Sequence, residues 1–436
     1  MRRRGGFVVQ ALAVAVLGAA VAAPMYAAGF GIFEQGAKAM GEGGAFTAQA
    51  DDPSAMFFNA GGVAFMTKRE FSIGTTYIHD TKAEFKGAAP FPGAGYTASQ
   101  KKLSVFLPQV YYVQPINPTW KFGIGVYTPF GLTTEWENPD QFAGRFLSTK
   151  AALRVFDLNP TLGWQVTPDF GIGFGGVVRY SDVELNRHIG IINPFTQTAA
   201  DVARLKLKGD FNTGYGWNVG LLHKVNPSFS WGLSYRSKIN IEYSGDARLT
   251  QISSGNPVFD AVVAGRLPFA TNLPVKTKID FPDMASLGLA FGITPDLLVE
   301  TDVNWTGWST FRNVPITFTG GATNSLPSTT IPESWKDAYN YRLGVRWTTS
   351  PATQWRFGYV YDQTPQREEG VSPLLPDADR NGFSLGYGWS GGVKVDLALM
   401  YLPFHQRPRS RSFTGEGPFF GTYNTTAWLF GATLGF

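Results

Sequence analysis

The sequence predicts an all-β protein: a closed antiparallel transmembrane β-barrel of about fourteen strands, plugged by its own N-terminal segment. Short turns alternate with long polar loops after position 66, and the runs between them alternate apolar with polar residues. Aromatic residues make up 15% of the chain. Outer-membrane barrels share these features, because their periplasmic turns are short, their extracellular loops are long and aromatic girdles mark both membrane interfaces.

The short turns are the clearest signal. Each contains proline or glycine between two strand-like runs. They lie at Asn117-Pro118, Thr167-Pro168-Asp169, Asn226-Pro227-Ser228, Thr294-Pro295-Asp296, Ser350-Pro351-Ala352 and Ser390-Gly391-Gly392. Together with the long loops between them they predict about fourteen strands, an even number that places both termini on the periplasmic side.

The predicted strands have a period of two, as expected when one face meets lipid and the other meets the lumen. Between Phe229 and Tyr243 the odd-numbered positions are mostly apolar, so we expect all of them to face lipid. The chain ends on an aromatic residue, Phe436, in register with the lipid face of its last strand. The predicted strands are 69–79, 101–115, 119–128, 151–166, 169–189, 206–225, 228–243, 276–293, 296–310, 338–349, 353–363, 381–390, 393–403 and 423–436.

The N-terminus indicates secretion. Three arginines precede an apolar run and small residues, so residues 1–27 are predicted to be a signal peptide. Removing these arginines takes the formal net charge from +4 to +1, which suggests no nucleic-acid partner. The chain has no cysteine, which excludes disulfides and thiol chemistry. We expect a monomer surrounded by outer-membrane lipid, with no cofactor.

Residues 28–66 show no strand alternation and are rich in small residues. A barrel of about fourteen strands is too wide for its own side chains to fill, so something must close its lumen. We therefore expect 28–66 to form a plugging hatch and 67–436 to form the barrel.

Several segments together resemble the FadL-type family of outer-membrane channels for long-chain fatty acids and aromatic hydrocarbons. They are the Ala28-Gly29-Phe30 start, the glycine-rich stretch ending in Asp51-Asp52, Phe57-Phe58-Asn59, Pro129-Phe130-Gly131-Leu132, Asn159-Pro160 and Leu375-Pro376-Asp377-Ala378-Asp379-Arg380. One departure is that family members usually carry Asn-Pro-Ala where this chain has Asn59-Ala60-Gly61. The missing proline implies a less rigid hatch.

The resemblance implies passive uptake across the outer membrane of a Gram-negative bacterium, gated by the hatch and by an inward kink in the third strand. Asn59 would belong to the hatch part of the gate. Pro129 and Gly131 have the composition of a kink, because proline lacks a hydrogen-bond donor and glycine packs weakly in a strand. From residue types alone they could equally begin the long loop.

The predicted ligand-binding residues are apolar apart from one cation. In the hatch they are Phe30, Ile32, Phe33 and Phe58, and in the fourth loop, where a short helix is expected, they are Phe259 and Val262. The cation is Arg187, which the resemblance aligns with a position that meets a fatty-acid carboxylate; the alternative is that it pairs with Glu184.

A second family cation falls near Pro315, so it is missing unless Arg312 replaces it. The substrate is therefore expected to be a long-chain fatty acid, with a less polar, toluene-like hydrocarbon as the alternative.

Enzymatic activity is not expected. Gly382-Phe383-Ser384-Leu385-Gly386 matches a nucleophile motif but lies inside an alternating strand, and the glycine pattern at 171–176 opens a strand, the wrong context for dinucleotide binding. The chain's four histidines lack the spacing of a metal site. The one enzymatic alternative is an esterase that uses Ser384 with His405.

Overall fold

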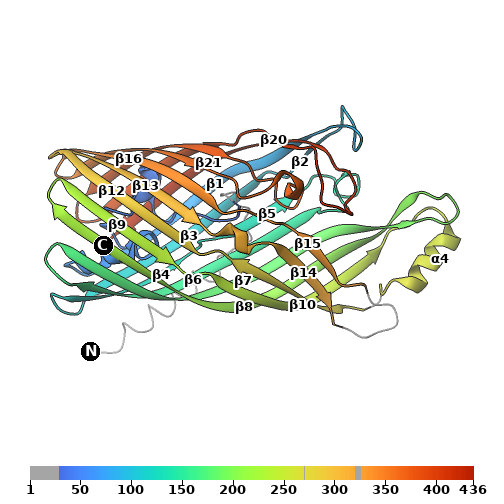
Figure 1. Cartoon of the computed structure of the whole chain (residues 1–436), viewed down its shortest axis with the longest axis horizontal. Helices are drawn as coiled ribbons and strands as arrows, with labels where there is room; N and C mark the ends of the chain where they lie inside the picture. Colours follow the sequence, from blue (N-terminus) through green and yellow to red (C-terminus); the bar gives the residue numbers. More distant parts are fainter. Residues whose placement is uncertain (1–28, 270, 320–325) are drawn as a thin grey trace.

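The computed structural model describes residues 29–436 apart from 270 and 320–325, so the predicted signal peptide lies outside the described residues (Figure 1). The wall is a closed antiparallel barrel of 14 strands, which confirms the predicted fold class. No helix in the described part of the chain is long and apolar enough to cross a membrane.

The wall strands follow one another around the barrel in chain order. The first seven are β1 (Glu70–Gly87), β3 (Leu103–Pro115), β4 (Trp120–Tyr127) with β5 (Gly131–Glu135), β6 (Lys150–Gln165), β7 (Phe170–Ile192), β8 (Ala199–Asn226), and β9 (Phe229–Arg236) with β10 (Ile239–Gln251). The other seven are β11 (Leu273–Phe281) with β12 (Met284–Thr294), β13 (Leu297–Thr306) with β14 (Asn313–Phe318), β15 (Thr329–Pro332) with β16 (Ala338–Ser350), β17 (Thr353–Asp362), β18 (Arg380–Ser390), β19 (Lys394–Pro403) and β21 (Gly421–Gly435). Two short edge strands, β2 (Thr97–Ser99) and β20 (Arg407–Arg409), extend the wall, and β1 pairs with β21 to close it.

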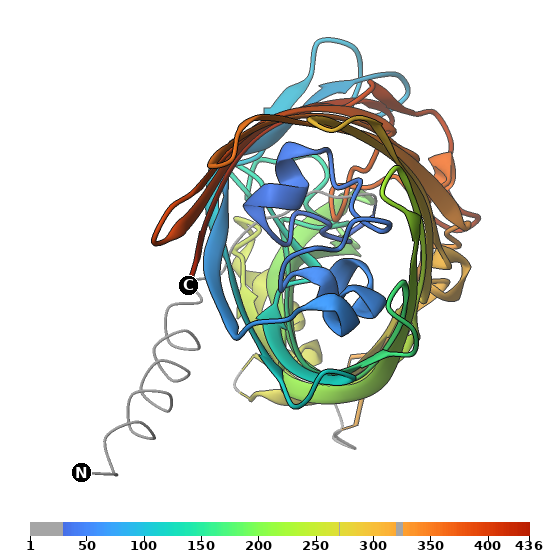
Figure 2. The same ribbon diagram turned by 90° about the vertical axis from the view of Figure 1, so that its left-hand side faces the viewer.

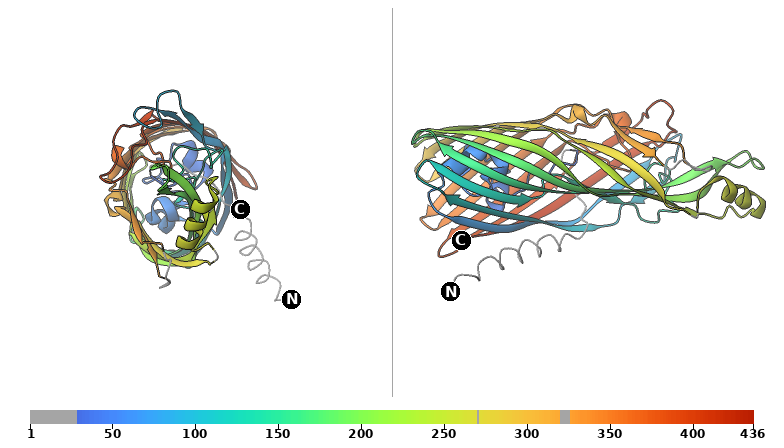
Figure 3. Two further views of the ribbon diagram at one scale, coloured as in Figure 1. Left: turned by 90° about the vertical axis from the view of Figure 1, so that its right-hand side faces the viewer. Right: turned by 90° about the horizontal axis from the view of Figure 1, so that it is seen from below.

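The six predicted short turns all lie between consecutive wall strands, and the chain's C terminus lies at the same end of the barrel. The long loops lie at the other end, where α4 (Pro257–Arg266) projects beyond the wall (Figure 3). Several strands run past their predicted ends into these loops, because the alternation continues beyond the lipid-facing band. β8, for example, begins at Ala199, where the prediction began at 206.

Five wall strands are interrupted partway along their length: β4/β5, β9/β10, β11/β12, β13/β14 and β15/β16. The first interruption opens the wall. β3 pairs with β4 only as far as the Val110–Val126 pair, and β5 pairs with β6 but not with β3. The inward kink expected around Pro129 and Gly131 is therefore a real break in the ladder between β3 and β5.

The break between β9 and β10 corrects one expectation. The odd-numbered residues of β9 face outward as predicted, but Ile239, Ile241 and Tyr243 of β10 are buried inside the barrel. The prediction that all odd positions from Phe229 to Tyr243 face lipid was wrong, because the alternation reverses at Ser237 and Lys238, the two residues between β9 and β10.

The N-terminal segment (residues 29–66) lies inside the lumen, as Figure 2 shows from the short-turn end. It contains α2 (Ala37–Gly41), α3 (Ala55–Phe58) and the 3-10 helix η1 (Ala60–Phe65). α2 lies against β18 and β19, and η1 lies against β6 and β7. The segment therefore touches strands from both ends of the barrel sequence.

Glycines on the inner wall let the backbone of this segment approach closely. Gly163, Gly173 and Gly220 lie opposite one another in β6, β7 and β8, directly under η1. A Cβ atom on Gly163 would lie 2.7 Å from the amide nitrogen of Ala64. On the opposite wall, a Cβ on Gly386 would lie 2.8 Å from the Cα of Gly41.

Buried carboxylates of the wall also hold the segment. Asp302 accepts hydrogen bonds from the backbone amides of Phe46 and Thr47, at 3.0 and 3.1 Å, and Glu300 accepts one from Ala48 at 2.6 Å. Buried hydrogen bonds to charged groups are among the stronger ones in proteins. Docking of the segment is thus specified by polar contacts as well as by glycine packing.

Candidate functional site

Phe30 is enclosed by aromatic rings from the interrupted strands. It is 2% exposed, and five rings surround it with centroids 4.6 to 6.0 Å away. We call these five residues the aromatic cage: Phe130, Phe281, Trp308, Phe311 and Trp335. Four of the five interruptions contribute at least one ring, so the cage is built from the residues at the breaks in the wall.

The backbone around Phe30 pairs with the broken third wall strand. Gly31 forms an antiparallel bridge with Phe130. The amide of Ile32 donates to the carbonyl of Pro129 at 2.8 Å, and the amide of Gly131 donates to the carbonyl of Phe30 at 2.9 Å. The N-terminal segment thus acts as a short extra strand at the break, and moving Phe30 out of the cage requires these hydrogen bonds to open.

The loop between β17 and β18 holds the start of the segment. The buried carboxylate of Asp377 accepts hydrogen bonds from the Gly29 amide at 3.0 Å and from the Thr364 hydroxyl at 2.5 Å. Burial raises the pKa of Asp377 to about 6, although Arg380 nearby opposes the shift. The carboxyl that holds the segment therefore changes its protonation state in mildly acidic solution.

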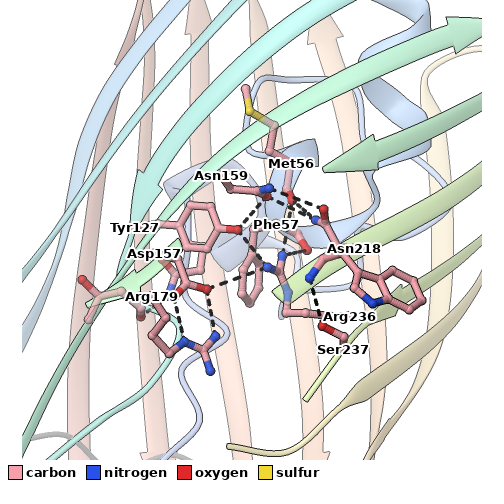
Figure 4. Close-up of polar contacts among 12 residues, drawn as sticks. Met56, Phe57, Tyr127, Asp157, Asn159, Arg179, Asn218, Arg236 and Ser237 are labelled. Carbon is pink, nitrogen blue, oxygen red and sulfur yellow. Dashed lines mark hydrogen bonds and ion pairs between the residues drawn. The ribbon is translucent and has the colours of Figure 1, made fainter. Parts of the chain in front are cut away.

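A polar network lies next to the cage (Figure 4). Arg179 donates two hydrogen bonds to Asp157, at 2.7 and 2.8 Å, and its guanidinium lies 4.6 Å from the Phe130 ring. Arg236 donates to the hydroxyl of Tyr127 at 2.9 Å and to backbone carbonyls of the N-terminal segment. Both arginines thus have partners within the network, although one buried guanidinium nitrogen of Arg179, Nη1, makes no hydrogen bond.

An apolar interior connects the cage with the loop end of the barrel. The inward side chains of β10 and β11 belong to the same buried cluster as Phe30, and so do Phe259 and Val263 of α4. They include Ile239, Ile241, Tyr243, Leu249, Leu273, Val275 and Ile279. A hydrophobic molecule entering between the loops would meet apolar side chains as far as the cage.

Arg187 has no counter-ion among the described residues. It lies half-buried on β7 and lines a cavity of about 390 Å³ with Ile189 and Phe146. Its Nε is buried and has no hydrogen-bond partner. The alternative pairing with Glu184 was wrong, because Glu184 lies 3.2 Å from Lys150 and 3.4 Å from Lys206.

The second cation of the resemblance is not supplied by Arg312. Pro315 lies in β14 and carries no charge, and Arg312 is exposed in a depression on the outer wall. Its Nε donates to the carbonyl of Ser309 at 3.2 Å. Of the two cations that the resemblance implies, Arg187 alone is present at its expected position.

The other predicted ligand residues fall into two groups. Ile32, Phe33 and Phe58 are buried in the cluster that contains Phe30. On α4, Phe259 is 1% exposed but Val262 is 40% exposed, and Val263 takes the buried position. The structure thus does not bring Val262 to the interior. Its neighbour Val263 was missed because the phase of so short a helix is hard to fix from sequence.

Asn59, the predicted gate residue of the hatch, lies at a junction. Its amide nitrogen donates to the carbonyl of Thr47 at 2.7 Å and to the carbonyl of Leu221 in β8 at 2.9 Å. Its oxygen accepts from the Gly61 amide at 3.0 Å and caps η1. The Asn59 side chain therefore links Thr47 and Gly61 of the segment to Leu221 of the wall. The next residue is Ala60, at the position where the resemblance implied a proline.

The sequence missed four cage residues, Phe281, Trp308, Phe311 and Trp335. The available signal was an aromatic residue close to a proline or glycine inside a predicted strand, as in Phe281-Pro282 and Gly307-Trp308. Proline and glycine within strands mark breaks and bends. Only the fold shows that these breaks lie side by side.

The residues of the esterase alternative do not meet. The Ser384 hydroxyl donates to the carbonyl of Gly41 at 3.2 Å. His405 faces the side-chain amide of Asn381 at 2.9 Å. Within the described part of the chain no group of histidine, aspartate and glutamate side chains is arranged to hold a metal ion.

A transmembrane barrel with the N-terminal segment inside its lumen and an apolar interior that leads from the outer loops to the caged Phe30 defines a channel for hydrophobic molecules in the outer membrane. Residues 18–436 match the family described as "Outer membrane protein transport protein (OMPP1/FadL/TodX)". The chain belongs to this family of outer-membrane transport proteins, which agrees with the predicted resemblance.

Relatives and solved structures agree with this assignment. The chain is 26% identical to the long-chain fatty acid transport protein of Escherichia coli, over 472 residues and 100% of both chains. It is 24% identical to outer membrane protein P1 of Haemophilus influenzae, over 81% of each chain. A FadL homologue from Pseudomonas aeruginosa has the same fold, with a TM-score of 0.83 and 21% identity over 94% of this chain and 99% of that one. The toluene transporter TodX of P. putida gives 0.69 and 18% over 92% and 97%.

Proposed function

We propose that the protein carries long-chain fatty acids passively across the outer membrane. The observation that supports this most directly is the continuous apolar interior between α4 and the aromatic cage, with the unpaired Arg187 beside it. Full-length relatives named as long-chain fatty acid transport proteins support the same substrate class.

The energetics assign separate roles to the tail and the head group of the ligand. Each buried methylene contributes about 0.8 kcal/mol, so a long acyl chain supplies on the order of 10 kcal/mol before the costs of binding. A charge-assisted hydrogen bond adds about 1.5 to 3 kcal/mol. The apolar route therefore supplies most of the affinity, and Arg187 orients the carboxylate.

The gate in this proposal is the N-terminal segment at the broken third strand. An acyl chain that reaches the cage competes with Phe30 for the same aromatic rings. Release of Phe30 opens the two backbone hydrogen bonds to Pro129 and Gly131, and it frees the gap between β3 and β5. Asn59 keeps the rest of the segment on the wall while this happens.

The alternative substrate is a monoaromatic hydrocarbon. Two observations favour it: the second cation that the resemblance implies is replaced by Pro315, and the cage is built from aromatic rings, which pack well on a flat aromatic ligand. TodX, whose fold is similar, is titled a toluene transporter. We propose no catalytic role for Ser384, and a monomer as the working unit.

Reconstituted vesicles test the proposal. The protein should raise the rate at which a fluorescent long-chain fatty acid enters the vesicles. Arg187→Gln should weaken fatty-acid binding about tenfold, which corresponds to the loss of one charged hydrogen bond, and should leave toluene uptake unchanged. Arg248→Gln is the matched control, since Arg248 is exposed on β10.

Each result decides a different point. If neither ligand enters faster than in empty vesicles, the channel proposal is wrong. If Arg187→Gln reduces uptake of both ligands equally, Arg187 is a structural residue and leaves the site. Toluene entry without fatty-acid entry selects the hydrocarbon alternative.

A further inference from the structure

The strand breaks also create a depression on the outside of the barrel, and its lining between Gly307 and Arg312 flanks the cage residues Trp308 and Phe311. It has a volume of about 780 Å³ and lies where β8, β9, β11, β12 and β13 meet. Its lining combines aromatic and charged side chains. Those that matter here are Trp217, Tyr235, Lys238, Asp283, Trp305 and Arg312.

The depression does not continue into the apolar interior. Between β8 and β10 the ladder is interrupted, but the side chains of Ile239 and Ile241, each 1% exposed, fill the gap against Gly214 and Gly216. The backbones of Trp217 and Ser237 close its lower edge with a hydrogen bond of 2.9 Å. A molecule in the depression is therefore held on the outer wall, separate from the transport route.

Its height matches the outer membrane interface. Trp217 lies nine residues before Asn226 at the short-turn end of β8. At roughly 3.4 Å per residue on a strand tilted by about 40°, this is about 23 Å along the barrel axis. The apolar band of such barrels is ~25 Å tall and ends in aromatic girdles, so the depression lies where lipid head groups begin.

The charges of the depression favour an anion. Lys238 is exposed, and no hydrogen bond or ion pair joins it to the described residues. Arg312 uses only its Nε, for the Ser309 carbonyl, and the rest of its guanidinium is free to bind. Asp283 accepts a hydrogen bond from the Tyr235 hydroxyl at 3.0 Å. Two cations and one carboxylate leave one net positive charge next to the lipid.

Below the depression the wall is aliphatic. Leu233, Leu287 and Val303 lie opposite one another on β9, β12 and β13, and they are 43%, 47% and 41% exposed. These three side chains form an aliphatic strip across the lipid face, two residues along β9 and β13 from Tyr235 and Trp305 of the aromatic floor. Acyl chains could lie along this strip.

We propose that the depression binds a phosphate-bearing glycolipid of the outer leaflet. Lys238 and Arg312 hold the phosphate, Trp217, Tyr235 and Trp305 pack against the sugar, and the acyl chains follow the aliphatic strip. Basic pockets at head-group height bind anionic lipids by this combination of charge and apolar contact. A glycolipid fits better than a transported fatty acid, because the site offers two cations and a wide aromatic floor outside the sealed wall.

Titration of the detergent-solubilised protein with lipid A tests this inference by native mass spectrometry. Diphosphorylated lipid A should bind at least about tenfold more tightly than dephosphorylated lipid A. The preference should disappear in Lys238→Gln/Arg312→Gln. It should persist in Arg248→Gln/Lys276→Gln, which removes two exposed charges from the adjacent strands β10 and β11.

Unchanged binding in the first double variant, or an equal loss in the second, would contradict the inference. Displacement of lipid A by millimolar inorganic phosphate would instead show a simple anion site and would also contradict it. A measurement on the unmutated protein covers the case of misfolding: lipid A should protect Lys238, but not Lys276, from acetylation. Equal reactivity of the two lysines with bound lipid A would refute the site.

Discussion

At the scale of single residues, two phenylalanines of the N-terminal segment have different surroundings. Phe30 meets only aromatic rings in its cage. Phe33, three residues later, lies with its ring 4.5 Å from the guanidinium of Arg342. A carboxylate introduced at position 33 would lie next to a cation, whereas the rings of Phe130 and Phe281 would stand between one at position 30 and Arg179.

Phe30→Asp should therefore free the N-terminal segment from the broken strand, and Phe33→Asp should do so much less. An unpaired buried carboxylate costs about 3 kcal/mol or more, while a carboxylate beside Arg342 recovers part of this cost. Hydrogen exchange of residues 30–33 measures the effect. Equal exchange in both variants would show that the cage does not hold the segment.

The sequence could indicate which residues are apolar or charged, but not the phase of a short helix. The apolar hatch residues lie in the buried interior and Arg187 lines a cavity, and their role in ligand binding stays a prediction. Val262 was placed inside and is not, because one position along a helix turns a side chain by about 100°. The partner of Glu184 depends on lysines from neighbouring strands, which no local pattern shows.

At the scale of elements, the fit between the N-terminal segment and the wall depends on glycines with direct backbone contacts. Gly173 faces the backbone of Ala60, so a side chain there would collide with η1. Gly176, on the same strand, has no atom within 4 Å of the place where its Cβ would be. The same substitution would therefore collide with the N-terminal segment at Gly173 and would meet no atom at Gly176.

Gly173→Val should displace η1 without preventing barrel formation, because the ladder hydrogen bonds are unchanged. The expected cost of overpacking is about 1 to 3 kcal/mol, carried by the N-terminal segment. In planar-bilayer recordings, Gly173→Val should show a higher conductance for small ions than the unmodified protein. Gly176→Val should behave like the unmodified protein. An unchanged conductance in Gly173→Val would show that close contact at Gly173 does not hold η1 in place.

Strand positions could be predicted from turns and alternation, because both are local signals. The interruptions could not be predicted in this way, since each depends on how the neighbouring strands pair with the interrupted one. Ser237 and Lys238 look like continued alternation in the sequence, yet they reverse the faces of the following strand. Pro129 and Gly131 left a kink and a loop start equally open, and only the missing ladder with β3 distinguishes the two.

At the scale of the whole molecule, closure of the wall dominates the expected stability. β1 pairs with β21 from Ser72–Gly435 to Gly87–Gly421, so the described wall has no free edge along this seam. An unpaired edge is where detergent or another strand could begin to open a sheet. The molecule should therefore resist sodium dodecyl sulfate until it is heated.

Unboiled samples should migrate faster on gels than boiled ones, with circular dichroism dominated by β-structure. The same should hold for the substitutions proposed above, since none removes a ladder hydrogen bond. Identical migration of boiled and unboiled protein, or a helical spectrum, would contradict a closed barrel.

The position of the N-terminal segment has a consequence for the order of assembly. This segment precedes every wall strand in the chain, yet it packs against early strands through η1 and against late strands through α2. A finished cylinder would leave no simple way to thread helices into such close contact with its inner surface. The seam between β1 and β21 must accordingly be the last to close, around a plug that is already inside, so insertion into the membrane and sealing of the lumen are one event.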